Sequence, residues 1–413
     1  MSEAAASRPG GGGAFTFQNI FSPEIIADPY PMYHQLRAAS PVLELADANL
    51  VVLTRYADVQ AALRDRRLGH DTFGNLSAED REAALRNPAI ANLARTMLLK
   101  NPPDHTRLRG LVVKAFDARR VAAMRERIRS IAHDLIDGFI ERGAGDLKAL
   151  FNHPLPVIVI CDMLGVPEAD RAEFIKGTRI SGRLVDPSPM TDQELADANR
   201  STQESQAYFT ALCDARRKAP RDDLITALVQ SETEHGKLST EELTSNIALL
   251  FAAGHETTVN LLGNGLLALY RNRDQLDALR ADPGLMSNAV EEFLRYDSSV
   301  QLTGREALED VEIAGVAVPK GRSVIALLGA ANRDPAEFDD PDRLVVRRPG
   351  VKPMSFGGGI HFCLGAQLAR LEAAEALTAL FERLPDLELT EIERPDWKPT
   401  ITLRGVTQLP ATW

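Results

Sequence analysis

Cysteine is scarce in this chain of 413 residues, which has only Cys161, Cys213 and Cys363. Three cysteines cannot form a disulfide framework, and an odd number is typical of proteins from a reducing compartment. A structural zinc site needs about four ligands, yet the sequence has no Cys-x-x-Cys pair. The scarcity therefore argues against a fold that disulfides or zinc stabilise.

An excess of positive charge is also absent, because 47 lysines and arginines stand against 58 aspartates and glutamates, a net charge of −11. A nucleic acid is therefore not expected as a partner of the whole molecule. The first residues lack the apolar segment of a secretion signal. Residues 1–14 are expected to form a disordered tail, and the protein is expected to be cytoplasmic.

Uninterrupted apolar runs are missing as well. The segment 246–270 is long enough, at roughly 20 residues or more, to cross a bilayer. Its middle contains four polar residues that hydrocarbon would penalise: His255, Glu256, Asn260 and Asn264. The segment is therefore interpreted as a buried helix with a functional interruption, and no membrane association is expected.

The start of this central helix is marked by a capping box. Ser239 is followed three residues later by Glu242, which predicts a helix that begins near Thr240. Within the helix, His255 is expected to face outward.

Repeats, and linkers rich in proline, glycine or serine, are absent after residue 14, so residues 15–413 are predicted to form one large domain. Alternating apolar residues predict β-hairpins over 40–56 and 310–321, and strands around a turn over 399–410. Apolar residues spaced by three and four predict helices through most of the remaining chain. The predicted fold class is mainly α with small β-sheets (α+β).

The segment FGGGIHFCLG, residues 356–365, surrounds one of the rare cysteines with glycine. Glycines 357–359 let backbone N–H groups approach a sulfur closely. The helical period that follows places Cys363 at a helix N-terminus, where the dipole favours a thiolate. A zinc ligand, a nucleophile with His361 as its base and a buried structural cysteine are the alternatives, and the last does not account for the glycines.

This segment resembles the haem-binding loop of the cytochrome P450 family, whose pattern is Phe-x-x-Gly-x-x-x-Cys-x-Gly. Phe356, Gly359, Cys363 and Gly365 match it. The resemblance implies that Cys363 is the axial ligand of a haem iron, an arrangement that favours O–O cleavage, and that Phe356 and Gly365 help to bind the cofactor. It also implies a triangular prism of helices around a buried haem.

The stretch AGHETT, from Ala253 to Thr258, places an acid and an alcohol inside an apolar helix, which is costly unless they are paired or wetted. The stretch resembles the oxygen-activation motif of the same family. The resemblance implies that Glu256 and Thr257 relay protons and that Ala253 lies against the haem. Alternatively, the Thr257 hydroxyl bonds only to a carbonyl of its own helix.

Two further groups of charged residues match the family. Glu292 and Arg295 are spaced for an ion pair on one helix face. Such pairs often lie at the surface in contact with water and contribute little to stability. The resemblance to the Glu-x-x-Arg motif implies a structural ion network with Arg343 as third member. It also implies that four residues bind the haem propionates: His105, Arg109, Arg305 and His361.

The resemblance places a substrate pocket beside the central helix. Six residues are candidates for its wall: Leu98, Leu99, Ala252, Val300, Leu302 and Val406. Each could equally be part of the core. An apolar wall favours an apolar organic substrate.

A basic segment lies between Lys100 and Ser130, with nine lysines or arginines against three acidic residues. The resemblance places it on the face where electron donors dock. A basic patch would attract an acidic ferredoxin or flavodoxin. A solvated helix face is the alternative.

The sequence therefore predicts a haem-thiolate monooxygenase that inserts one oxygen atom of O₂ into an apolar small molecule. The expected cofactor is haem b, with electrons from NAD(P)H delivered through a ferredoxin or flavodoxin and its reductase. A monomer is expected. The alternatives are a peroxide-driven haem enzyme and a haem-thiolate sensor without turnover.

Overall fold

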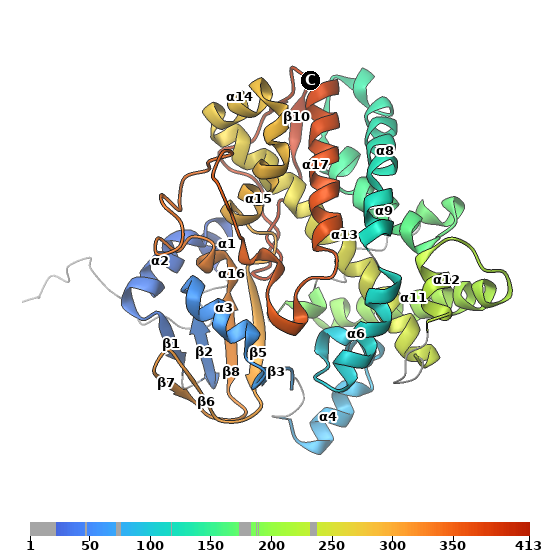
Figure 1. Ribbon diagram of the computed structural model, residues 1–413, viewed down its shortest axis with the longest axis vertical. Coiled ribbons are helices and arrows are strands. Elements are labelled where there is room, and N and C mark those ends of the chain that lie inside the picture. Colours follow the sequence, from blue (N-terminus) through green and yellow to red (C-terminus); the bar gives the residue numbers. More distant parts are fainter. Residues whose placement is uncertain are drawn as a thin grey trace, which may run out of the picture.

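A 32-residue helix, α13 (Thr240–Arg271), runs through the middle of the molecule (Figure 1). The computed structural model describes residues 22–45, 48–71, 76–116, 118–172, 183–186, 188, 190–231 and 238–413; the predicted tail, residues 1–14, lies outside them. The capping box is present, because Ser239 Oγ accepts a hydrogen bond from the Glu242 N–H and the Glu242 carboxylate accepts one from the Ser239 N–H. The predicted start at Thr240 is confirmed.

Helices form most of the described chain, and Figure 1 shows the longer ones gathered around α13 and several shorter ones beside the main sheet. The other α-helices are α1 (Pro23–Ala27), α2 (Tyr30–Ala39), α3 (Tyr56–Arg64), α4 (Ala78–Leu85), α5 (Pro88–Ala94), α6 (Asp104–Ala115), α7 (Ala118–Ala123), α8 (Arg125–Asp137), α9 (Pro154–Leu164), α11 (Asp192–Lys218), α12 (Leu224–Val229), α14 (Arg273–Ala281), α15 (Met286–Tyr296), α16 (Leu328–Ala331) and α17 (Ala366–Arg383). The fold class predicted from the sequence is confirmed.

The strands form three small sheets. A five-stranded sheet has the order β1-β2-β8-β5-β3, a three-stranded sheet has the order β4-β10-β9, and β6 pairs with β7. Both predicted hairpins, β1–β2 and β6–β7, are antiparallel pairs. The strands are β1 (Val42–Leu45), β2 (Leu50–Leu53), β3 (Leu68–Gly69), β4 (Ala144–Asp146), β5 (Leu302–Ala307), β6 (Val311–Ile313), β7 (Val316–Val318), β8 (Ser323–Leu327), β9 (Glu388–Leu389) and β10 (Pro410–Thr412).

The segment 399–410 differs from its prediction, because apart from the first residue of β10 it contains only isolated bridges, such as the one between Leu403 and Val300. The carboxylate of Asp186 accepts the N–H groups of Ile401 and Thr402. A side chain therefore satisfies backbone donors that a neighbouring strand would otherwise satisfy.

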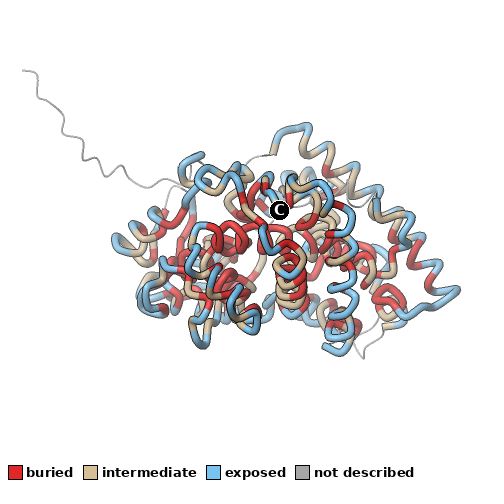
Figure 2. Tube along the Cα trace, turned by 90° about the horizontal axis from the view of Figure 1, so that it is seen from above, coloured by how far each residue is buried: buried red, intermediate tan, exposed pale blue. Residues whose placement is uncertain are grey.

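The apolar core follows this division into helices and sheet. The largest buried cluster joins α6, α8, α9, α13, α15 and α17, while two smaller clusters lie on the faces of the five-stranded sheet. Figure 2 shows the buried residues concentrated in the interior beneath an exposed outer layer. Nowhere in the described ranges is a helix both long and apolar enough to cross a membrane. The Cys363 segment directly precedes α17, at the junction of the helical and sheet regions.

Candidate active site

Cys363 lies three residues before the first residue of α17, and its N–H donates to the Phe356 carbonyl at 3.0 Å. Burial of the sulfur raises the pKa of Cys363, whereas the Gly365 N–H and the guanidinium groups of Arg109 and Arg370 lower it. The Cys363 side chain nevertheless has exposed surface, and the Gly365 N–H and the two guanidinium groups act in the direction predicted from the sequence, towards the thiolate. A bound metal cation would deprotonate the thiol.

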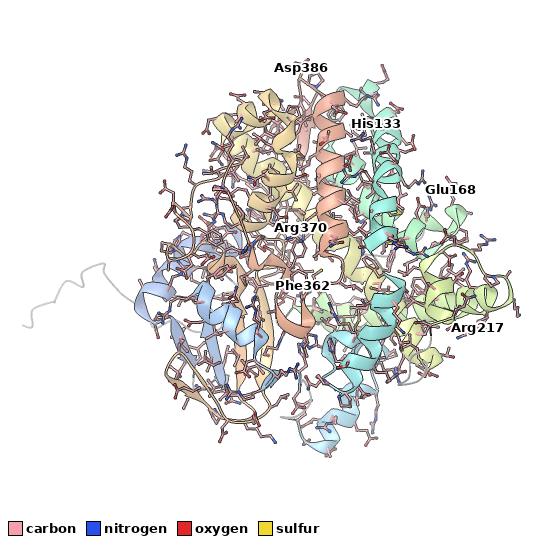
Figure 3. All side chains as sticks on the ribbon, viewed as in Figure 1. His133, Glu168, Arg217, Phe362, Arg370 and Asp386 are labelled. Carbon is pink, nitrogen blue, oxygen red and sulfur yellow. The ribbon has the colours of Figure 1, made fainter. Side chains whose placement is uncertain are left out.

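The glycines before Cys363 allow close packing as well as a sharp bend. Gly359 has φ +65°, and a Cβ at this position would overlap the carbonyl oxygen of Leu63 at the end of α3. Gly357 also has a positive φ, +67°. The Cys363 segment is therefore fixed directly against α3, and Figure 3 shows the neighbouring Phe362 between the sheet region and α6.

Three histidine rings meet beside this segment. The His361 ring centroid lies 4.3 Å from that of His105 and 4.7 Å from that of His70. The Nε2 atoms of all three rings are buried and have no hydrogen-bond partner among the described residues. The resemblance pointed to His105 and His361. His70 follows the two-residue strand β3 and has no motif of its own, so sequence reasoning missed it.

Two arginines complete this group. Arg109 donates to the Phe362 carbonyl at 2.5 Å, and Arg305 is buried on β5. Burial lowers the pKa of Arg305 to about 10, and burial together with neighbouring cations, Arg305 among them, lowers that of His361 to about 2. Within the described ranges, no carboxylate forms an ion pair with either arginine. Unpartnered nitrogens and unpaired arginines fit two carboxylates such as the haem propionates.

The middle of α13 is open on one side although the helix is otherwise mostly buried. Ala253 is exposed and Thr257 is half-buried, one turn apart. The Thr257 hydroxyl donates to the Ala253 carbonyl at 3.0 Å. The hydroxyl hydrogen is therefore bonded within the helix, as the alternative interpretation of the sequence proposed. The Glu256 carboxylate accepts from Lys398 at 3.0 Å, with 17% of each side chain exposed. Sequence reasoning missed Lys398, because it lies 142 residues from Glu256.

His255 is buried, and the expectation that it faces outward is wrong. Its Nδ1 lies 2.9 Å from the Phe251 carbonyl, and its ring packs between those of Phe251 and His153. Burial lowers the pKa of His255. The helix is covered by protein on this side, so even its polar residues are buried there.

The predicted ion network is present with one different member. Arg295 donates two hydrogen bonds of 2.7 Å to Glu292, and both side chains are fully buried. Arg348 lies 3.2 Å from both carboxylate oxygens. Arg343, the predicted member, contributes only its carbonyl to Arg295, while its own side chain is 62% exposed. The loop turns the Arg343 guanidinium outward, so Arg348 replaces it.

The six pocket candidates do not form one group. Leu98, Leu99, Ala252 and Val300 are half-buried. Leu302 is buried against α2 and borders an apolar pocket whose wall contains no residue of the Cys363 segment or α13. Val406 is buried within reach of Gly263, about two turns along α13 from Glu256. The first four therefore remain the stronger candidates.

The basic segment is largely neutralised. Arg125 and Arg129 pair with Glu375, and Arg127 pairs with Asp162. Outside these pairs, Arg107 and Arg120 also have acidic partners, Glu242 and Asp222. The net charge of the basic segment therefore overstates the positive potential that it offers to a partner.

Known proteins resemble the whole chain. The sequence model of the family described as Cytochrome P450 matches residues 32–406. The vitamin D(3) 25-hydroxylase of Pseudonocardia autotrophica is 42% identical over 399 residues, which cover 95% of this chain and 96% of that protein. Two crystal structures share the fold: myxobacterial cytochrome P450 CYP267B1 in complex with myristic acid (TM-score 0.87, 42% identity, coverage 96% and 99%) and P450BioI in complex with an acyl carrier protein ligated to hexadec-9Z-enoic acid (TM-score 0.88, 35% identity, coverage 95% and 100%).

Proposed function

Because the chain belongs to the cytochrome P450 family, it is a haem-dependent oxidoreductase, and we propose that it inserts one oxygen atom of O₂ into a long, apolar organic molecule. The proposed cofactor is haem b, reduced by electrons from NAD(P)H through a ferredoxin or flavodoxin and its reductase. One observation carries the proposal: Cys363 lies at the start of α17 beside three unpartnered histidine nitrogens and two arginines without a carboxylate partner among the described residues.

The residues of this chain would divide the work of holding the cofactor. Cys363 would bind the iron, and Arg109 and Arg305 would each hold a propionate through charge-assisted hydrogen bonds. The histidine cluster, His70, His105 and His361, would donate to the remaining propionate oxygens. The haem ring itself would be bordered by Phe356, Gly365 and Ala253. When bound, the haem supplies O₂ activation and oxygen transfer.

Protons would reach the oxygen-binding side along α13. The Thr257 hydroxyl uses its hydrogen for the Ala253 carbonyl, so its oxygen is left to accept a hydrogen bond on the open side of the helix. Glu256 would supply protons from the other side of the turn, since adjacent helical residues point about 100° apart. The two residues would thus link bulk water to the site, a role worth roughly 10²-fold or more in rate.

The substrate would be held by apolar contacts that exclude water. Four candidate wall residues are half-buried: Leu98, Leu99, Ala252 and Val300. A wall of apolar side chains favours a substrate with a large apolar surface. The two fatty acids and the vitamin D(3) in the names of the similar proteins support the same substrate class. For electron delivery, Val113 and Phe362 are each 43% exposed on two segments that Arg109 joins, which supports docking of the donor there.

The test uses the haem-loaded protein with myristic acid, hexadec-9Z-enoic acid and vitamin D(3) as probes. Displacement of iron-bound water by a probe is read as a spectral shift. NADPH with a surrogate ferredoxin and reductase should yield a product with one added oxygen. Product from peroxide alone would indicate a peroxygenase instead, and binding without any product would indicate a sensor; either result overturns the proposal. Cys363→Ser should lose the long-wavelength Soret band of the reduced carbonyl complex.

A further inference from the structure

Three polar residues of α13 lie four residues apart: Glu256, Asn260 and Asn264. This spacing places them on one face of the helix. Asn260 and Asn264 are buried, where an amide without partners would be costly. Such a polar stripe in an otherwise apolar helix indicates a specific polar partner, and the proton pathway proposed above uses only Glu256.

That partner is the C-terminal segment 397–406. The ammonium group of Lys398 lies 3.0 Å from the Glu256 carboxylate and 2.8 Å from Asn260 Oδ1. One turn further along, Asn264 donates to the Arg404 carbonyl at 3.1 Å. A Cβ on Gly405 would overlap the Asn260 side chain. The segment therefore lies directly on the stripe, with Lys398 at the end that holds Glu256.

The backbone around Lys398 is held by contacts independent of its ammonium group. The Lys398 N–H donates to the Gly405 carbonyl at 2.9 Å. The Arg404 guanidinium lies 3.6 Å from the Trp397 ring centroid and pairs with Asp297 at 2.7 Å. Because both ends of the segment are fixed, the lysine side chain reaches Glu256 from one direction.

We propose that Lys398 is a positioning residue that acts through Glu256, an inference that rests on the proposed proton role of Glu256. Lys398 holds the carboxylate on the side of α13 that faces the C-terminal segment, and Asn260 fixes the ammonium group there. A lysine has three N–H donors, and these two partners occupy two of them. The third can hold a water molecule next to Glu256, so Lys398 also marks where protons enter.

The experiment compares four single variants of the haem-loaded protein: Glu256→Gln, Lys398→Met, Lys398→Arg and Lys148→Met. Lys148 is the matched control, because its ammonium donates to the Thr407 carbonyl of the same C-terminal region and not to Glu256. The readout is the peroxide released per NADPH consumed with a surrogate ferredoxin and reductase, without organic substrate. Thermal melting of each variant and of the double variant Glu256→Gln/Lys398→Met gives a second readout.

We expect Glu256→Gln to change the peroxide ratio by about threefold or more and Lys398→Met to change it in the same direction. The double variant should change it no further, and its loss of melting temperature should be smaller than the sum of the losses of the two single variants, since residues in one ion pair are not additive. Lys398→Arg should restore most of the wild-type ratio, and Lys148→Met should leave it unchanged.

The other outcomes separate the two proposals. If Glu256→Gln changes the ratio and Lys398→Met does not, Lys398 is only a structural partner and the inference is overturned, while the proton role of Glu256 stands. If Glu256→Gln itself has no effect, the proton role fails and the inference fails with it. Additive effects in both readouts would also overturn the inference.

Discussion

The guanidinium group of Arg348 lies 3.2 Å from both carboxylate oxygens of Glu292, whose side chain has no exposed surface. Glu292 also accepts two hydrogen bonds from Arg295 and one from the Val345 N–H. Helix α15 is thereby joined to the chain that leads to the Cys363 segment. Removing one cationic partner from a buried carboxylate lowers the free energy of unfolding more than breaking an ion pair at the surface does.

This relationship predicts a contrast between two nearby arginines. Arg348→Ala should lower the free energy of unfolding by about 3 kcal/mol, because it leaves a buried charge with one partner fewer. Arg343→Ala should change it by less than about 0.5 kcal/mol, since its side chain is 62% exposed. Urea unfolding of the haem-loaded variants measures both, and equal losses would contradict the assignment of Arg348.

The sequence predicted contacts that are local or belong to a motif, and it missed those that the path of a loop decides. The Glu292–Arg295 pair follows from helical spacing alone. Arg343 and Arg348 lie on the same loop, and only the folded path turns one of them inward. Lys398 and His70 belong to no local pattern, because tertiary packing brings their partners to them, Glu256 on α13 and His361 in the Cys363 segment.

His70 is expected to affect cofactor retention. His70→Ala removes one ring from the histidine cluster and should increase the rate of haem loss several-fold, measured by transfer to apomyoglobin. His34→Ala is the control, because His34 lies at the surface against Asp342. Equal rates in the two variants would show that His70 does not contact the propionates.

Buried His255 predicts a pH dependence of stability. Burial lowers its pKa below 6.5, so the folded protein keeps it neutral while the unfolded chain takes up a proton as the pH falls. At a pH well above the unfolded pKa of about 6.5, His255 is neutral in both states and does not change the free energy of unfolding. As the pH falls below about 6.5, His255 lowers the free energy of unfolding progressively. Between pH 7.5 and 5.5 it should cost at most about 1.4 kcal/mol.

His255→Asn keeps a donor towards the Phe251 carbonyl and removes the titrating group. The stability of this variant should therefore fall less than that of the wild type over the same pH range, measured by urea unfolding at each pH. Parallel curves would contradict a neutral, buried His255.

Gly359 allows the strongest test of how the Cys363 segment is positioned. An alanine there meets two obstacles: a left-handed backbone with φ +65° and overlap with the Leu63 carbonyl of α3. Gly315 shares only the first, since it has φ +84° and nothing within 4 Å of an added Cβ. Gly315→Ala should therefore cost about 1 kcal/mol, the price of backbone strain alone. Gly359→Ala should cost clearly more, because a backbone carbonyl cannot move aside as a flexible side chain can.

The two variants also differ in their expected effect on the cofactor. Gly359→Ala must push the segment away from α3, so it should reduce haem content and weaken the long-wavelength Soret band of the reduced carbonyl complex. Gly315→Ala, in the turn between β6 and β7, should leave the band unchanged. If Gly359→Ala kept a normal band and lost no more stability than Gly315→Ala, contact with α3 would not set the position of Cys363. The glycine would then be required only for the bend.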